Sequence, residues 1–173
     1  MLYTDSKQYL ISKLKEAGVQ SKVFTTQKAL EKSLESHIAA VLFQRETFAR
    51  NGSKKRYRDE GGAQHKRRKL MERTTTFSVL IGGYSDDDVE ARFDKFMSIL
   101  DEGIYVDGNY VPIIPEEADW VDKDDSLLKA QVAVQIFITF QGGVYRDTDF
   151  APLSRVEITS IEKKSGKDAT DGD

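Results

Sequence analysis

The sequence contains no cysteine among its 173 residues. This absence excludes disulfide bonds, thiolate nucleophiles and cysteine-ligated zinc or iron–sulfur sites. Long hydrophobic runs are also missing, because the most apolar stretch, Val132 to Phe140, is interrupted by Gln135 and Thr139. A membrane-spanning helix needs about 20 mainly apolar residues, and the first residues lack the basic start and apolar stretch of a secretion signal. We therefore expect a cytosolic protein that does not enter a membrane.

Histidine is also scarce, with only His37 and His65. We interpret His37 as lying at the edge of an apolar strand and His65 as lying in a cationic loop that disfavours its protonation, each without a visible partner. The sequence has no GxSxG or HExxH motif. Gly82-Gly83 and Gly142-Gly143 lack the spacing of phosphate-binding loops, so we interpret both pairs as strand ends. The sequence therefore predicts no enzyme, no catalytic residue and no cofactor.

Two groups of carboxylates raise the question of a metal site. Asp86 to Asp88 follow Ser85, and a serine cap followed by acids is typical of a helix start. Asp122, Asp124 and Asp125 lack the loop pattern of a calcium site. We therefore expect no bound metal.

The length and the mass of 19.6 kDa fit a single domain. Hydrophobic residues make up 39% and charged residues 32%, which is the composition of a soluble globular protein. We predict one α+β domain over residues 1–160 and, from its polar composition, a flexible tail over residues 161–173.

Hydrophobic periodicity predicts two main helices and a set of strands. The first helix begins at Asp5 or Ser6 and ends at Gly18, and the second begins after Ser85 and runs to about Leu100. Whether a short helix follows Thr26 stays open. The predicted strands cover residues 19–25, 37–48, 74–83, 104–106, 110–113 and 128–141.

Within these strands the pattern also predicts faces and turns. Val41, Phe43 and Arg45 should share one face of their strand, and Asp107-Gly108 is typical of a hairpin turn. Residues 116–126 read as an acidic connection, and Val156 and Ile158 are compatible with a late strand. The expected fold is α+β, a mixed and mainly antiparallel sheet with two helices packed on one face and a long basic β-hairpin excursion.

Charge is strongly segregated along the chain, although the overall net charge is only −3. Residues 45–73 hold eleven Lys or Arg against four Asp or Glu, a net charge of +7, and residues 85–125 hold fourteen acids against three bases, a net charge of −11. The basic segment reads as a long exposed loop or hairpin. Complementary charges favour pairing with a second copy or with separate partners, and Tyr57 among the cations is compatible with nucleic-acid binding. Two solvated loops are the simpler alternative.

Four segments carry a resemblance to a known family: the helix that ends at Gly18, AAVLFQ, TTTFSVLIGGYSDDDVEARFDKFMSIL and KAQVAVQIFITFQGG. In their order and lengths, residues 1–145 resemble the tail terminator proteins of long-tailed bacteriophages, including the Mu-like prophage type. The resemblance implies a non-enzymatic α+β protomer that forms a six-membered ring on the tail tube, stops its growth and offers a head-joining surface. It also implies a protein made in the bacterial cytoplasm and built into the virion tail.

The implied partners are further copies of the chain, the tail tube protein, the head–tail joining protein and DNA that passes through the ring. The basic residues expected to face the lumen or a neighbour are Lys54, Lys55, Arg56, Arg58, Lys66, Arg67, Arg68 and Lys69. The candidate acidic contacts between subunits are Asp119, Asp122, Asp124 and Asp125. The chain departs from the family in its very basic excursion and its extension beyond Arg146. A nucleic-acid-binding or general protein-interaction module is the alternative function.

Overall fold

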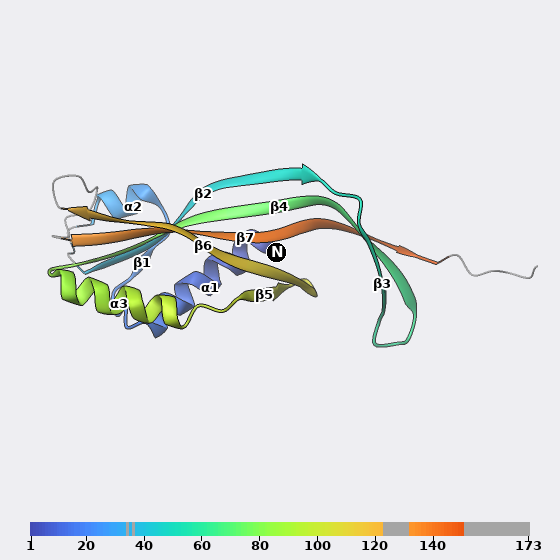
Figure 1. Ribbon diagram of the computed structural model, residues 1–173, viewed down its shortest axis with the longest axis horizontal. Coiled ribbons are helices and arrows are strands. Elements are labelled where there is room, and N and C mark those ends of the chain that lie inside the picture. The colour runs from blue at the N-terminus through green and yellow to red at the C-terminus, as the bar shows by residue number, and fades with distance from the viewer. Residues whose placement is uncertain (34, 36, 123–131, 151–173) are drawn as a thin grey trace, which may run out of the picture.

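The computed structural model describes residues 1–33, 35, 37–122 and 132–150 (Figure 1). The described residues contain three helices and seven strands. In chain order they are α1 (Leu2–Glu16), β1 (Val23–Phe24), α2 (Gln27–Glu31), β2 (Ile38–Arg50), β3 (Lys54–Arg58), β4 (Gln64–Gly83), α3 (Asp86–Ser98), β5 (Gly103–Val106), β6 (Asn109–Asp122) and β7 (Val132–Asp149).

The strands form one curled sheet in the order β1-β2-β4-β7-β6-β5, and β3 pairs with β4 beyond the end of β2. All neighbours are antiparallel except β1 and β2. The expected mixed, mainly antiparallel sheet combined with helices is therefore confirmed. The two central strands are long, with 20 residues in β4 and 18 in β7.

The main core is one cluster of buried apolar side chains from the sheet and from the helices α1 and α3. Phe77 and Phe140 pack edge to face at its centre, with ring centroids 6.1 Å apart. Both helices bury apolar side chains in the same cluster, because their apolar residues recur at helical spacing. The helical members are Leu2, Leu10, Leu14, Val89 and Phe96, and the sheet members include Val41, Val79, Ile81, Val134, Ile136 and Ile138.

The short helix α2 belongs to a second, smaller cluster. Its Leu30 is buried with Ile38, Ala40 and Ala133. Thr26 caps the helix, since its hydroxyl oxygen accepts a hydrogen bond of 3.4 Å from the amide of Ala29. The element left open after Thr26 is therefore a helix of five residues.

Local signals predicted α3 and the β5–β6 turn correctly. The Ser85 hydroxyl accepts a hydrogen bond from the amide of Asp88 at 3.4 Å, as expected for a helix cap. Asp107 and Gly108 have φ values of 50° and 74°, which the two-residue hairpin turn requires. The start of α1 was predicted too late, since the helix begins at Leu2 and Ser6 is buried within it.

The prediction of an acidic connection after Pro115 is wrong over its first part. Glu116 to Asp122 belong to β6, and Ala118 to Asp122 pair with β7 after an irregularity at Glu116 and Glu117. This segment is the outermost strand of the sheet over that length, and charged side chains are typical of such an edge because they discourage pairing with other chains. The rest of the predicted connection, residues 123–126, lies outside the described residues.

Gly142-Gly143 does not end β7, which continues to Asp149. A Cβ atom on Gly142 would lie 2.7 Å from Cδ2 of Leu2, so the glycine allows the start of α1 to approach the sheet closely. Gly82-Gly83 does lie at the end of its strand, as predicted. The predicted late strand and the predicted tail over residues 161–173 lie outside the described residues.

The expected faces of β2 are correct only up to Phe43. The register with β4 shifts between Phe43 and Arg45, so Phe43 pairs with Phe77 and Glu46 with Thr75. Glu46, and not Arg45, therefore shares the face of Phe43. An extra residue in a strand reverses the alternation beyond it, which a regular period of two does not reveal.

Candidate functional site

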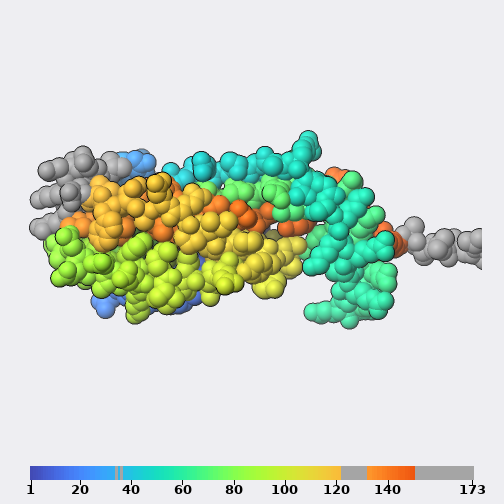
Figure 2. All heavy atoms as spheres, viewed as in Figure 1, coloured from blue at the N-terminus to red at the C-terminus, as the bar shows by residue number. Residues whose placement is uncertain are grey.

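A β arm extends from one end of the sheet, and it contains most of the basic segment. The arm comprises residues 53–70 and 145–150: β3, the first part of β4 and the last part of β7. It projects beyond the helices at the end of the molecule opposite the start of α3 (Figures 1 and 2). The basic segment, which read as a long exposed loop or hairpin, is largely strand, because β4 starts ten residues before the predicted strand at Thr74.

Like charges face each other across the strands of the arm. Lys54 pairs with Arg68, Lys55 with Arg67 and Arg56 with Lys66. Each such pair of like charges is unfavourable by about 0.2–1 kcal/mol relative to neutral residues. The arm therefore carries an electrostatic cost unless anions lie close to these side chains.

The alternation of side chains divides the arm into two faces, because residues that pair directly across strands share a face. The first is the network face, and its members form many contacts within the chain. They are Lys55, Tyr57, His65, Arg67, Lys69, Tyr145, Asp147 and Asp149. The second is the cationic face, whose charged members are Lys54, Arg56, Arg58, Lys66, Arg68 and Arg146.

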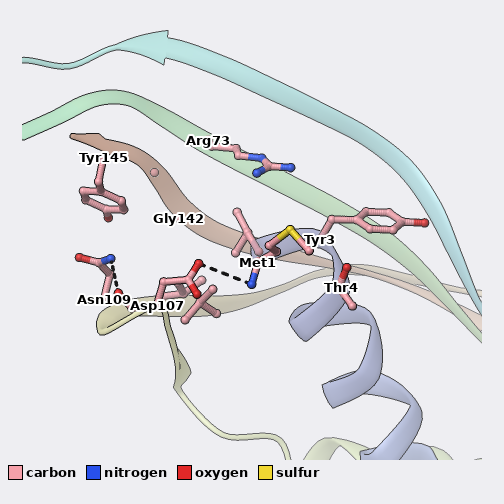
Figure 3. Close-up of a pocket in the computed structure, with 12 residues that line it drawn as sticks. Met1, Tyr3, Thr4, Arg73, Asp107, Asn109, Gly142 and Tyr145 are labelled. Carbon is pink, nitrogen blue, oxygen red and sulfur yellow. Dashed lines mark hydrogen bonds and ion pairs between the residues drawn. The ribbon is translucent and has the colours of Figure 1, made fainter. Parts of the chain in front are cut away.

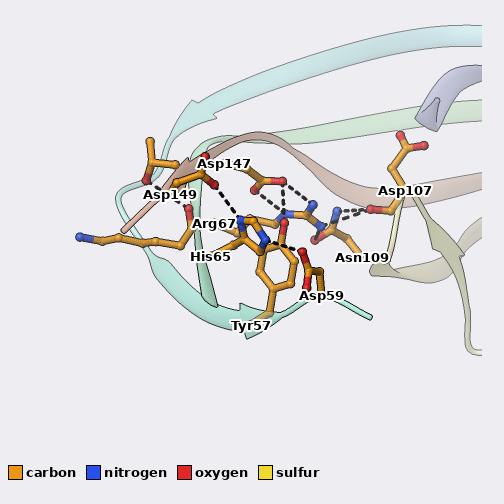
Figure 4. A network of polar contacts seen from close by, with 10 residues as sticks. Tyr57, Asp59, His65, Arg67, Asp107, Asn109, Asp147 and Asp149 are labelled. Atoms are coloured by element: carbon orange, nitrogen blue, oxygen red, sulfur yellow. Dashed lines mark hydrogen bonds and ion pairs between the residues drawn. The ribbon is translucent and has the colours of Figure 1, made fainter. Parts of the chain in front are cut away.

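Arg67 is the centre of the network face (Figure 4). Its Nε and Nη2 atoms donate to the two carboxylate oxygens of Asp147 at 2.8 and 2.7 Å. Its Nη1 donates to the carbonyl of Asp107 at 3.2 Å and to Oδ1 of Asn109 at 3.3 Å, both beside the β5–β6 turn. The hydrogen bonds from Arg67 lower the pKa of Asp147. Arg67 thus connects β4, β7 and the β5–β6 turn.

His65 lies between two carboxylates on the same face. Its Nδ1 is 2.8 Å from Asp149 and its Nε2 is 2.9 Å from Asp59, while its ring stacks on Tyr57 (Figure 4). Hydrogen bonds to Asp59 and then Asp149 raise the pKa of His65. The prediction of a histidine without a partner, whose protonation is disfavoured, is therefore wrong. Asp149 lies 84 residues further along the chain, and only the pairing of β4 with β7 brings it to His65.

The cationic face has no comparable partners. Among the residues that the structure describes, none of its six charged side chains forms an ion pair. Lys66 is half-buried and the other five are exposed. Among the described residues, the only aromatic contact of these six side chains places the Arg56 guanidinium 5.7 Å from the ring centroid of Phe150.

The eight predicted basic residues divide between the two faces. Lys54, Arg56, Arg58, Lys66 and Arg68 lie on the cationic face, and Lys55, Arg67 and Lys69 lie on the network face. Sequence reasoning missed Arg146, which extends the cationic face onto β7. The alternation of Tyr145, Asp147 and Asp149 with Arg146 and Thr148 was the signal, and it was obscured by the assumption that Gly142-Gly143 ends the strand.

The candidate acidic contacts lie at the other end of the molecule. Asp119 and Asp122 lie in the last part of β6, while Asp124 and Asp125 lie outside the described residues. Nearby, Asp88 of α3 forms an ion pair with Arg92 at 2.9 Å, and Nδ1 of His37 lies 3.2 Å from the Arg92 guanidinium and 3.5 Å from a carboxylate oxygen of Asp88. His37 therefore also has partners that its sequence context did not predict.

A pocket of about 380 Å³ lies between the start of α1, the β5–β6 turn and Gly142-Gly143 of β7 (Figure 3). Its charged groups already contact other groups of the chain. The amino group of Met1 lies 3.5 Å from Asp107, and Arg73 donates to Glu46 at 2.7 Å. The pocket therefore presents no convergent set of titratable groups to a ligand.

Two features are absent from the described part of the chain. No group of three or more His, Cys, Asp or Glu side chains there is arranged to hold a metal ion. None of the described helices combines the length and the apolar character needed to cross a membrane.

Comparisons with known proteins identify no family. No protein-family model matches this chain, and no curated protein matches it. The functional argument therefore rests on the residues and their arrangement.

Proposed function

We propose that this chain is a structural protein of a long-tailed bacteriophage or prophage, the terminator that forms a ring on the end of the tail tube. In this role it stops polymerisation of the tube and provides the surface to which the head joins. The observation that carries the proposal is the separation of charge along the long axis of the protomer. An α+β protomer with α1 and α3 on one face and a basic hairpin excursion also agrees with the family resemblance.

The two charged regions lie at opposite ends of the protomer. The acidic end includes Asp86 to Asp88 at the start of α3 and Asp119 and Asp122 in the last part of β6. The cationic arm lies at the far end (Figure 1). Different surfaces that attract each other favour head-to-tail contacts, and such contacts close into a ring when the rotation per subunit divides a full turn.

The open edge of β6 also suits a subunit with a limited number of neighbours. From Ile114 to Asp122 this strand pairs only with β7, so its outer backbone groups are free of sheet partners among the described residues. Glu116, Glu117 and Asp119 along the edge oppose indiscriminate strand addition. A partner with cations in the right places removes that repulsion, which makes the contact selective.

The proposal is tested by the solution mass of the full chain over a concentration series, measured by light scattering, with negative-stain images at high concentration. A six-membered ring predicts a discrete species at six times 19.6 kDa, about 118 kDa. Asp119→Lys with Asp122→Lys is expected to weaken the species, and Lys7→Glu in α1, away from both ends, serves as the control variant. A monomer at every concentration would contradict assembly from charge complementarity and would favour an interaction module.

A further inference from the structure

The network face pairs its cations His65, Arg67 and Lys69 with carboxylates, whereas the cations of the cationic face form no ion pair among the described residues. Asp147 and Asp149 of β7 both fall on the network face, where they bind Arg67 and His65. On the cationic face, the position of β7 that pairs with Arg68 is another cation, Arg146. The carboxylates of β7 are therefore not used to balance this surface.

The cations of the cationic face form a regular array. Lys54, Arg68 and Arg146 lie in one row across three strands, and Arg56 and Lys66 form the next row. Neighbouring strands are about 4.8 Å apart and alternate residues of a strand about 6.6 Å apart, so positive charge covers the face at short intervals. Nothing within the described fold offsets the resulting repulsion, whereas a polyanion that follows the array relieves it along its length.

The composition of the face distinguishes a nucleic acid from an acidic protein. Stable protein interfaces have an apolar core with aromatic or aliphatic anchors. On the cationic face the only exposed large apolar side chain among the described residues is Phe150, which is 41% exposed. Interfaces with nucleic acids are more polar and much more positive, and guanidinium groups bind phosphate oxygens in pairs.

We infer that the cationic face binds nucleic acid through its backbone phosphates, without sequence specificity. The contacts come from Lys54, Arg56, Arg58, Lys66, Arg68 and Arg146, and Phe150 offers a ring on which an unpaired base stacks. Phosphates are shared by duplex and single strand, so both bind. The inference goes beyond the proposed function and stands on the arm alone, since a single protomer presents the complete face.

The test measures binding of the full chain to a fluorescent duplex of about 20 base pairs, and to one of its strands, by anisotropy at several salt concentrations. Six phosphate contacts predict a slope of about −5 in a plot of log affinity for the duplex against log salt concentration. The variant Lys54→Gln with Lys66→Gln removes two charges from the cationic face. The matched control, Lys55→Gln with Lys69→Gln, removes two charges from the same strands on the network face.

The cationic-face variant is expected to make the slope less steep by about 2. If the affinities of the variant and of the unchanged chain converge at 1 M salt, this corresponds to a loss of about 60-fold in affinity at 0.1 M salt. The control is expected to bind like the unchanged chain. Arg146→Gln, on a different strand, is expected to reduce the slope by about 1. Lys54, Lys66 and Arg146 each lie opposite another cation, so the arm should stay folded in the variants of the cationic face, which amide hydrogen exchange verifies.

Three results would overturn the inference. The first is an equal loss of affinity in the two lysine variants, which would mean that total charge and not this face determines binding. The second is that polyglutamate competes as strongly as DNA at equal charge, which would show that binding does not require phosphate groups. The third is a change in solution mass without a change in DNA affinity, which would assign the face to contacts between subunits. Failure of the unchanged chain to form a ring would contradict the proposed function and leave this inference intact.

Discussion

Replacing Arg67 by lysine should loosen the arm without unfolding the body. Arg67 makes four hydrogen bonds, two to Asp147 and two to the β5–β6 turn. A lysine keeps the charge but not the planar fork that makes these bonds together. Hydrogen bonds to charged groups contribute about 1.5–3 kcal/mol, but exposed ion pairs only about 0.2–1 kcal/mol. Since Arg67 is 21% and Asp147 39% exposed, we expect a loss of about 1–2 kcal/mol, between these limits.

The assay is amide hydrogen exchange, which reports opening of the arm separately from global unfolding. A loss of 1–2 kcal/mol predicts that protection in the arm falls by about 5- to 30-fold. The melting temperature should change by less than about 2 °C, because the main core does not include Arg67. Arg68→Lys, the same change one residue away on the cationic face, should leave protection unaltered. Equal effects of the two substitutions, or none from Arg67→Lys, would refute the role assigned to the fork.

Two further changes test His65 in the arm and Ser6 in α1. The pKa of His65 is raised by Asp59 and Asp149 above its ordinary value of about 6.5, so its contribution to arm stability is complete below that pH and is lost as pH rises through the raised pKa. Protection of the arm, corrected for intrinsic exchange, should fall over that range in the natural chain but not in His65→Gln. Ser6 has a buried hydroxyl without a hydrogen-bond partner among the described residues, so Ser6→Ala should leave the free energy of unfolding unchanged or raise it by about 1 kcal/mol. A clear drop in the free energy of unfolding, measured by urea denaturation, would contradict this.

Features that depend on neighbouring residues were predictable from the sequence. The Ser85 cap and the Asp107-Gly108 turn involve backbone groups within three residues of each other, so their chemistry is complete in a short segment. The alternation in β4 around Phe77 was likewise enough to identify a strand with one buried face. The coarse fold follows from such local signals because they show which faces of the helices and strands are apolar and must be buried.

Features that depend on register were not predictable. The contact of His65 with Asp149 is set by the pairing of β4 with β7, and the face of Glu46 is set by a single extra residue in β2. The division of the basic segment into two faces has the same origin, since in a loop the eight cations would be equivalent. A strongly charged segment looks like a loop by composition, and only its pairing shows that it is part of the sheet.

The wide sequence separation between the two sides of the arm has a consequence for biosynthesis. The hairpin of β3 and β4 is local, but Asp147 lies 80 residues after Arg67 and 90 after Tyr57. During translation the hairpin leaves the ribosome with its opposed cations and without the carboxylates of β7, which are made about 80 residues later. Closing so long a loop is also slow. The arm should therefore be the last part of the protomer to mature, so that newly made chains complete their body before they present a finished cationic face.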